Sequence, residues 1–401
     1  MAKRRILKRA HQTAPAPNRR RNGVAVIKVV GCGGGGGNAV TRMMETGRIK
    51  GVEFIAINTD AQDLDYASAH RKIYIGKALT RGLGAGMNTE IGKQAAEENR
   101  SEIGEALEGA DIVFVTAGMG GGTGTSASAV VSEIAREKGI LTVAVVTKPF
   151  SFEGAQRLTI ATEGIARLKD KVDSLVIIPN DRIFSLINKD TPVSRAFGYI
   201  DDVLKNAVQA IADLINAPGL INVDFSDIKT TLKDAGPTII GIGLASGQDR
   251  SIKAVNGAIN SPLIDISMEG AKGVLFSVAG GRDLKMTEVH DIAKAVSANL
   301  DSGARVIFGA YHDRNLKDKS LKVTVIATGF NGVFSQRTNL PTLFVNRDSG
   351  RKAEGKNLPT EFEEEMKTGG DLKINKGKAL KTGVEKTDSW EIPTFLRKKK
   401  K

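Results

Sequence analysis

The sequence predicts an α/β protein in which a nucleotide-binding domain, built on a mostly parallel sheet, is followed by a smaller α/β domain. Three observations predict this class. Several short apolar runs end in glycine-rich turns and are followed by helical spacing, which is typical of parallel strands joined by crossover helices. One long periodic helix spans residues 194–217. A second alternation of strand and helix patterns then fills residues 218–332.

The composition limits the classes of function. Of the 401 residues, 41% are hydrophobic, which is enough for sizeable cores. Cys32 is the only cysteine, which excludes an intrachain disulfide and suits a reducing cytosol. No apolar run approaches the ~20 residues that span a bilayer, so we expect a soluble protein.

The net charge of +13 is concentrated in the two ends of the chain. Residues 1–22 carry eight Lys/Arg and no acid, and residues 351–401 carry 14 basic and nine acidic residues. The stretch between them has 36 of each and is neutral, which argues against a specific nucleic-acid binder. We expect residues 1–22 to form a disordered basic tail that makes weak contact with anionic membrane surfaces.

In chain order, the first strand pattern lies at residues 24–30 and runs directly into glycines at residues 31–37. This run matches the dinucleotide fingerprint, and Asp60 lies 24 residues beyond Gly36, where an acid can bind a ribose hydroxyl. An NAD-dependent dehydrogenase is therefore one alternative. Cys32 has no neighbour in the sequence that would activate it as a nucleophile.

A second glycine loop spans residues 80–88, after the strand pattern at residues 71–76, and a third follows the strand pattern at residues 112–115. The helix after the third loop runs from Ala127 to a stop at Gly139. Backbone N–H groups in such a loop approach phosphates, the helix dipole favours negative charge, and hydroxyls add donors. The third loop contains Gly118, Gly120, Gly121, Gly122, Thr123, Gly124, Thr125 and Ser126.

Three glycine loops exceed the need of a dinucleotide fold and suit a nucleotide with a longer phosphate chain and a metal. The chain contains no G-x-x-x-x-G-K-[ST] segment, so it is not a P-loop enzyme. Backbone amides and hydroxyls must therefore hold the phosphates.

Two strand patterns, at residues 140–149 and 174–180, precede further candidates. Glu153 and Arg157 are four residues apart on the next helix, where they could form a solvated ion pair. Asn180 ends the later strand, and its amide can both donate to and accept from a base edge.

The helix over residues 194–215 has the clearest periodicity in the chain, with apolar residues spaced by three or four. Phe197, in its first turn, could pack in the core or stack on a base. The periodic set is Phe197, Ile200, Leu204, Val208, Ile211 and Ile215.

Asn222, Asp224 and Asp227 lie on the loop at residues 222–227, which enters another helix. One acid would be enough to cap that helix. A pair can also help to hold Mg²⁺ and orient or deprotonate an attacking water. A phosphate site made of backbone N–H groups has no base of its own, so an acid must come from elsewhere.

The end of the chain changes composition twice. Residues 333–387 are rich in Lys, Glu, Gly and Thr, which is typical of a disordered linker. Residues 388–401 hold the only tryptophan together with other apolar side chains far from any core, which indicates a docking peptide. Its expected contact residues are Trp390, Ile392, Pro393, Phe395, Leu396 and Arg397.

These motifs together resemble the FtsZ family, the tubulin-like GTPases of bacterial cell division. The resemblance covers about residues 24–330 and the last dozen or so residues. It rests on GGGGGNAV at 33–40, NTDAQ at 58–62, TRGLGAG at 80–86, GGGTGT at 120–125, VVTKPFSFEG at 145–154, IPND at 178–181 and NVDFSD at 222–227. Met87, Ser126 and Ser128 stand where the family usually has Ala, Gly and Ala.

The resemblance implies a tubulin/FtsZ-like fold with a Rossmann-like GTP-binding domain at residues 23–193, a central helix at 194–217 and a C-terminal domain at 218–332. In such proteins Glu153 would contact the ribose, Arg157 and Phe197 the base, and Asp202 the guanine N1–H and 2-amino group. The implied nucleotide-binding residues are Gly33, Gly34, Gly35, Asn38, Asn58, Asp60, Ala85, Gly86, Met87, Gly118, Gly120, Gly121, Gly122, Thr123, Gly124, Thr125, Glu153, Arg157, Asn180, Phe197 and Asp202.

The resemblance also implies a function. GTP would be hydrolysed to GDP with Mg²⁺ at the interface between successive subunits of a head-to-tail filament, with Asn222, Asp224 and Asp227 supplied by the neighbour. The filament would form the division-ring scaffold in the cytoplasm, on the inner face of the membrane. Residues 388–401 would bind membrane tethers and division regulators. A filament scaffold that does not hydrolyse its nucleotide is the second alternative.

Overall fold

The computed structural model describes residues 25–330, except 47–48, 50, 186, 189, 217–218, 262–267, 269, 299, 302, 314–315 and 318. The predicted tail at 1–22, linker at 333–387 and docking peptide at 388–401 lie outside the described residues. Within the described part, no helix is both long and apolar enough to cross a membrane.

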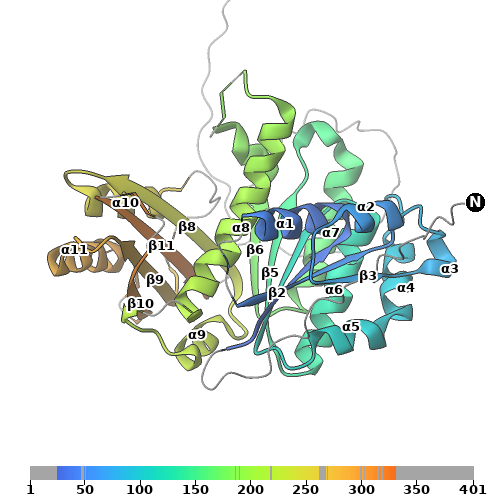
Figure 1. Ribbon diagram of the computed structural model, residues 1–401, viewed down its shortest axis with the longest axis horizontal. Coiled ribbons are helices and arrows are strands. Elements are labelled where there is room, and N and C mark those ends of the chain that lie inside the picture. The colour runs from blue at the N-terminus through green and yellow to red at the C-terminus, as the bar shows by residue number, and fades with distance from the viewer. Residues whose placement is uncertain are drawn as a thin grey trace, which may run out of the picture. The chain divides into compact units, whose positions relative to one another are not determined.

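The N-terminal part of the chain forms a parallel sheet with helices around it (Figure 1). Its strand order is β3-β2-β1-β4-β5-β6. Each predicted apolar run is one of its strands, and the central strands are buried because helices cover both faces. This order places the switch between the two halves of the sheet at β1 and β4. The strands are β1 (Ile27–Cys32), β2 (Val52–Asn58), β3 (Arg71–Tyr74), β4 (Ile112–Gly118), β5 (Leu141–Lys148) and β6 (Ser174–Pro179).

Seven helices of the described chain accompany these strands. Two of them begin earlier in the sequence than the pattern predicts. The helix predicted from Ala127 begins at Gly122, and the helix predicted after the first glycine run begins at Gly33. Glycine has low helix propensity, which is why the sequence suggested loops, but close backbone packing overrides that preference here. The helices are α1 (Gly33–Glu45), α2 (Ala61–Tyr66), α3 (Lys77–Thr80), α4 (Thr89–Glu98), α5 (Arg100–Leu107), α6 (Gly122–Glu137) and α7 (Ala155–Lys169).

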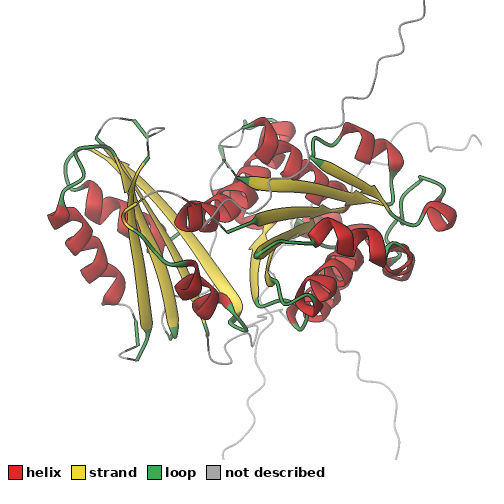
Figure 2. Cartoon of the chain, turned by 60° about the horizontal axis from the view of Figure 1, so that its bottom comes forward, coloured by secondary structure: helices red, strands yellow, loops and turns green. Residues whose placement is uncertain are grey.

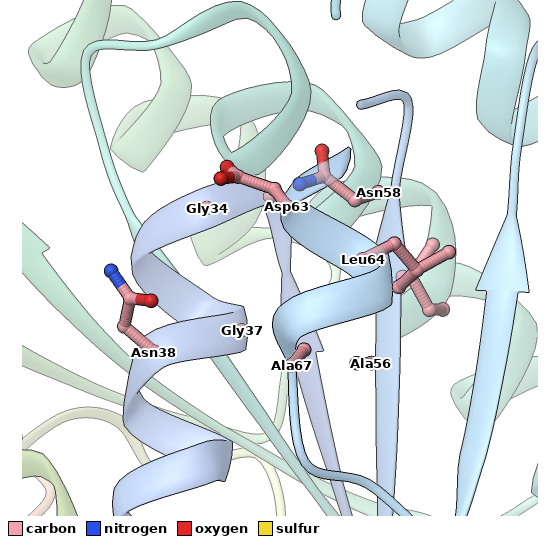
Figure 3. A pocket seen from close by; sticks show the side chains of 10 residues that line it. Gly34, Gly37, Asn38, Ala56, Asn58, Asp63, Leu64 and Ala67 are labelled. Atoms are coloured by element: carbon pink, nitrogen blue, oxygen red, sulfur yellow. The ribbon is translucent and has the colours of Figure 1, made fainter. Parts of the chain in front are cut away.

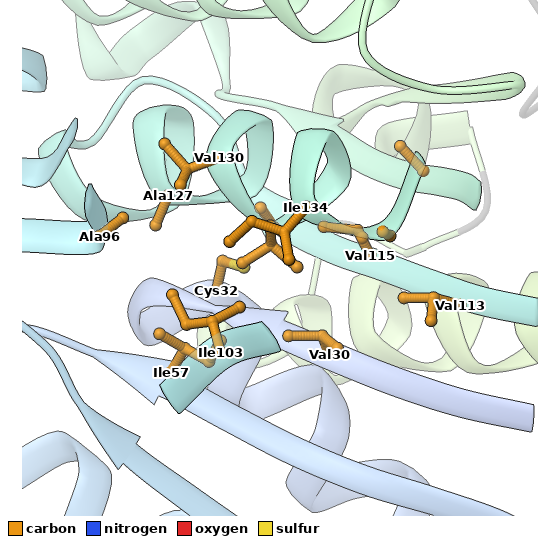
Figure 4. Packing of buried hydrophobic residues seen from close by; sticks show 14 of the residues in the cluster. Val30, Cys32, Ile57, Ala96, Ile103, Val113, Val115, Ala127, Val130 and Ile134 are labelled. Atoms are coloured by element: carbon orange, nitrogen blue, oxygen red, sulfur yellow. The ribbon is translucent and has the colours of Figure 1, made fainter. Parts of the chain in front are cut away.

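The two faces of the parallel sheet pack against different helices. On one face, side chains of α4, α5 and α6 such as Ala96, Ile103 and Val130 cover the strands (Figure 4). On the other, α1 and the long helix α8 (Val193–Asn216) pack on β4 and β5 through residues such as Met43 and Val208. α8 confirms the predicted periodic helix.

The C-terminal part forms a second group of strands flanked by helices (Figure 2). Their order is β8-β11-β9-β10-β7. The predicted alternation of strands and helices is confirmed. Strand β8 also pairs with β6 at two positions, so the described strands make one continuous sheet. The elements are β7 (Gly219–Ile221), α9 (Phe225–Leu232), β8 (Gly236–Ser246), α10 (Arg250–Ile259), β9 (Gly273–Gly280), α11 (Met286–Ser297), β10 (Arg305–His312) and β11 (Ser320–Thr328).

Candidate functional site

Two helices begin side by side at the switch point of the parallel sheet. Helix α1 follows β1 and α6 follows β4, and these neighbouring strands pair in register from Ile27 with Ile112 to Cys32 with Ala117. Neither helix has a side-chain hydrogen bond at its N-cap. Their first-turn N–H groups and the positive ends of their dipoles therefore point to the carboxyl edge of the sheet, an arrangement that favours an anion there.

Glycine is required in this site because the loops touch backbone to backbone. Gly33 has φ +69°, and a Cβ there would lie 2.8 Å from the amide nitrogen of Gly124. A Cβ on Gly122 would lie 2.5 Å from the carbonyl oxygen of Gly86, which accepts the Gly122 N–H at 2.7 Å. All three predicted glycine loops thus meet in one place, which the sequence alone did not establish.

The hydroxyl groups of the third loop mainly hold the loop in shape. The Thr123 and Thr59 hydroxyl oxygens lie 2.6 Å apart, and the Gly120 N–H donates to Thr125 Oγ1 at 2.9 Å. Ser126 donates to the Gly122 carbonyl oxygen at 2.6 Å, so the expectation that it offers a donor to a phosphate is not met in this conformation. The donors that remain for a ligand are mainly backbone N–H groups.

Cys32 lies directly before α1 and is fully buried. Burial raises the pKa of its thiol to about 12, so the thiolate does not form near neutral pH. This agrees with its interpretation as a small residue within the turn.

The acid at the end of β2 has a structural role. Asp60 is the N-cap of α2, and its Oδ1 accepts the N–H groups of Gln62 at 2.9 Å and Asp63 at 3.1 Å. Asn88 caps α4 in the same way, at the end of the second glycine loop. Asp60 is thus engaged as a cap, which is a different role from the ribose contact of the dinucleotide fingerprint.

A small hollow, open to solvent, lies between α1, α2 and β2 (Figure 3). The Asp63 carboxylate on α2 points toward Gly34 in the first turn of α1 (Figure 3). Asn58 lies nearby, and its Oδ1 accepts the Thr59 N–H at 2.8 Å. The hollow is lined by Gly33, Gly34, Gly37, Asn38, Ala56, Ile57, Asn58, Asp63, Leu64 and Ala67.

The residues expected around the base gather beyond β5 and β6. Glu153 and Arg157 form an ion pair at 2.5 Å, with a second Glu153 oxygen accepting the Phe150 N–H. Phe197 is 47% exposed and meets the buried Phe150 ring edge-on at 5.6 Å between centroids. Asn180 is 8% exposed, and its buried Oδ1 has no hydrogen-bond partner among the residues that the structure describes. Such an orphaned acceptor is typical of a ligand site.

Asp202 is engaged within the chain. It accepts from Lys205 Nζ at 2.7 Å and from the Arg42 guanidinium at 3.3 and 3.4 Å. Burial raises the pKa of this carboxyl, but the hydrogen bonds from Lys205 and Arg42 outweigh it and hold the pKa below its ordinary value. The neighbouring Asp201 has no such hydrogen bond within the described part of the chain, and burial raises its pKa to about 6.

The acid loop lies at the opposite edge of the sheet from the glycine loops. Gly236 pairs with Ser174, the first residue of β6, and the Ser174 hydroxyl donates to the carbonyl oxygen of Leu232 at the end of α9. Helix α9 therefore sits at the amino edge, near the lower end of α8 in Figure 1. Since the 24 residues of α8 span about 36 Å, the acids lie far from the loops of their own chain.

The acid-loop side chains themselves are exposed. Asp224 is the N-cap of α9 and accepts the Ser226 N–H at 3.4 Å, Asp227 lies in the first turn, and Asn222 accepts the Gly219 N–H at 2.7 Å. Asp224 thus caps α9, as the sequence allowed, and Asp227 does not. Across the described residues, no group of three or more His, Cys, Asp or Glu side chains could hold a metal by itself.

Comparison with known proteins agrees with this geometry. Residues 26–188 match the Tubulin/FtsZ family GTPase domain, and residues 236–331 match the FtsZ family C-terminal domain. An FtsZ dimer from M. jannaschii is 47% identical, with a TM-score of 0.72, and the match covers 76% of this chain and 88% of that one. The chain belongs to the FtsZ family.

Two further structures extend this result. A point mutant of M. jannaschii FtsZ is 46% identical, with a TM-score of 0.73 over 77% of this chain and 92% of that chain. CetZ2 from Haloferax volcanii, in a GTPγS-bound protofilament, is 22% identical with a TM-score of 0.64, over 75% of this chain and 92% of that one. At that identity the likeness shows the fold alone.

Membership of the FtsZ family confirms the predicted tubulin/FtsZ fold and assigns the chain to the tubulin-like GTPases. This membership does not favour the alternative of an NAD-dependent dehydrogenase. The sequence did not indicate Asp63, Arg42 or the contact between the rings of Phe150 and Phe197. An acid three residues after a capping acid could have indicated Asp63. Arg42 and Asp202 are 160 residues apart in sequence, so no local pattern indicates their contact.

Proposed function

We propose that this protein is a GTP-dependent polymerising GTPase that hydrolyses GTP between successive subunits and forms the scaffold of the division ring. One observation carries the proposal. The phosphate-binding loops lie at the carboxyl edge of the sheet and the exposed acids at the amino edge. A chain cannot fold its own acids onto its own loops, whereas a copy stacked head to tail supplies them.

In the proposed interface, the backbone N–H groups at the starts of α1 and α6 bind the phosphates and stabilise the charge that develops during transfer. Asp224 and Asp227 of the neighbour orient or deprotonate the attacking water, and Asn222 helps to position them. Asp224 uses only its Oδ1 as the cap, and both acids are exposed, so both carboxylates are available to a partner. Mg²⁺, when bound with the phosphates, supplies counter-charge.

The base is proposed to lie beyond β5 and β6. The unpaired Oδ1 of Asn180 supports a contact with a base-edge donor, and the exposed face of Phe197 supports stacking. A carboxylate accepts from both guanine donors, so Asp202 would favour GTP over ATP, and it must exchange its bond with Arg42 for this contact. Glu153 completes the set at the ribose.

Residues 388–401 are proposed to bind membrane tethers and division regulators, which would hold the filament on the cytoplasmic face of the membrane at the division site. The composition of the peptide, with exposed apolar residues next to lysines, supports this assignment.

The test compares hydrolysis of GTP per molecule across a range of protein concentrations. If neighbours complete the site, activity should rise steeply above a threshold concentration. Asp224→Asn keeps a capping side chain but removes the base, so this variant should bind GTP normally and hydrolyse it about a hundredfold more slowly or less. Asp249→Asn, an exposed acid before α10, is the matched control and should hydrolyse normally.

A mixing experiment locates the site. Gly121 has open space around its Cβ position, so Gly121→Val should fold but obstruct the start of α6. Mixed with Asp224→Asn, it creates interfaces in which an intact loop meets an intact Asp224, and activity should return. Activity per molecule that stays constant down to the lowest concentration would place the whole site within one chain and refute the proposal.

A further inference from the structure

Helix α9 carries the acid loop at its start, and it is too short to fix its own position. It has eight residues, and an isolated helix of that length is marginal in water. Its buried residues, Ile228, Thr231 and Leu232, lie from its middle to its C-terminal end. The direction in which α9 presents Asp224 therefore depends on how that end is held.

The start of β6 holds the C-terminal end of α9. The Ser174 hydroxyl donates to the carbonyl oxygen of Leu232 at 2.7 Å. The Gly236 N–H, at the start of β8, donates to the carbonyl oxygen of Asp173 at 2.8 Å. The turn over residues 233–235 thus runs between two fixed points.

The Asp173 carboxylate ties this turn to the parallel sheet. The residue is only 5% exposed, so its carboxylate needs donors within the protein. Its Oδ2 accepts the Thr142 N–H of β5 at 2.8 Å, and its Oδ1 accepts the Asp234 N–H of the turn at 3.4 Å. The position of the turn is therefore referred to β5 as well as to β6.

Arg136, in the last turn of α6, joins three segments through one guanidinium group. One nitrogen donates to Asp234 Oδ1 at 2.7 Å, and another donates to the carbonyl oxygens of Asp170 at 3.2 Å and Val172 at 3.5 Å. Its Nε lies 4.0 Å from Asp173 Oδ1. The helix that begins in the glycine loops thus ends in contact with the turn that follows the acid helix.

The pair of Arg136 and Asp234 restrains the turn more than it stabilises the fold. The Asp234 side chain is 60% exposed, and ion pairs in water contribute little to stability. Asp234 has φ +51°, a left-handed conformation that a residue with a Cβ adopts at a cost. The hydrogen bonds to Arg136 and Asp173 hold the residue in this conformation, which sets the angle at which α9 leaves the sheet.

We propose that Arg136 and Asp234 are positioning residues for the acid loop. By fixing the turn at the end of α9, they direct Asp224 at the nucleotide of the next subunit. The proposal rests on the split site proposed above. Since α9 is about 12 Å long, a tilt of about 5° at its end displaces Asp224 by about 1 Å, and a displacement of that size can slow a reaction about a hundredfold.

The test separates the two roles of a subunit, which supplies loops at one interface and acids at the other. A small amount of Arg136→Gln is added to an excess of Asp224→Asn, where only its acids can act, and to an excess of Gly121→Val, where only its loops can act. The unmodified protein is measured in the same mixtures, and the activity of the excess variant alone is subtracted. With Asp224→Asn in excess, Arg136→Gln should hydrolyse GTP about tenfold more slowly per molecule than the unmodified protein. With Gly121→Val in excess, the two should be equal.

Two further variants sharpen the comparison. Asp234→Asn removes the charge but keeps a residue type that adopts positive φ, so it should show the same one-sided loss. Arg100→Gln is the matched control, because it breaks an ion pair of 2.6 Å between α5 and Glu137 at the same end of α6. It should match the unmodified protein in both mixtures.

Three results would overturn the proposal while leaving the split site intact. Equal losses of Arg136→Gln in both mixtures would mean general destabilisation, and no loss in either would mean that the pair has no effect on the acids. A higher assembly threshold with normal hydrolysis above it would mean that Arg136 contacts the neighbour directly. An unmodified protein that gains no activity in these mixtures would overturn the split site, and with it the proposed function.

Discussion

Replacing Asp201 by asparagine should stabilise the protein in a pH-dependent way. Burial on α8 is the main reason that the pKa of this carboxyl rises from 3.8 to about 6, with Arg42 opposing the rise and Asp202 adding to it. A shift of about two units corresponds to about 3 kcal/mol. Because the side chain is partly exposed, solvent screening reduces the effect to about 1–2 kcal/mol.

The sign follows from the direction of the shift. An acid whose pKa is raised by folding contributes stability below its ordinary pKa of 3.8, and that contribution is lost as the pH rises through about 6. Asparagine does not ionise. The free energy of unfolding of Asp201→Asn should therefore exceed that of the unmodified protein by about 1–2 kcal/mol at pH 7.5. Near pH 4 the two free energies should be equal.

Urea unfolding at the two pH values, without nucleotide and at constant ionic strength, measures this difference. Asp291→Asn, at an exposed position of α11, is the control and should show no such dependence. An equal increase in the free energy of unfolding at both pH values would mean that packing, and not the charge of Asp201, causes the effect. A loss of stability at pH 7.5 would refute the reasoning, because it would mean that the ionised Asp201 is favourable.

Three further outcomes are expected. Gly122→Ala should destabilise the fold by about 1–3 kcal/mol in thermal unfolding, since its Cβ would lie 2.5 Å from the Gly86 carbonyl oxygen; an unchanged midpoint would refute the close approach. Arg250→Ala should cost about 3 kcal/mol in urea unfolding, because buried Arg250 binds Glu288 at 2.6 Å, and a much smaller loss would argue against the ion pair. Asn180→Ala should have the same stability as the unmodified protein without nucleotide, but it should bind GTPγS about tenfold more weakly in calorimetry. Equal affinity would show that Asn180 does not contact the base.

The strands and the central helix could be predicted because their side chains carry the periodicity of burial. The apolar runs of β1 and β4 and the spacing of Ile200, Leu204 and Val208 reflect their packing directly. The first turns of α1 and α6 could not be predicted in this way. Their glycines are there for backbone contact between distant loops, and local propensity carries no information about such contact.

The same distinction holds for the site. Motifs indicated which residues belong to the glycine loops, but the pairing of Asp202 with Arg42 and the use of Asp60 as a cap arise only when separate elements meet. The placement of Asp224 at the opposite edge depends on how α8 and β8 return to the sheet. The residue types indicated phosphate binding and acid–base chemistry. The path of the chain determined that the glycine loops and the acids lie at opposite edges of the sheet.

The separation of the acids from the loops has a consequence for assembly. Two different surfaces that bind each other make a heterologous contact, which cannot close within a pair and therefore adds subunits without limit unless the rotation forms a ring. In the proposed filament the two ends are chemically distinct. One terminal subunit exposes glycine loops that no neighbour's Asp224 can reach, and it should keep its GTP uncleaved until another subunit arrives.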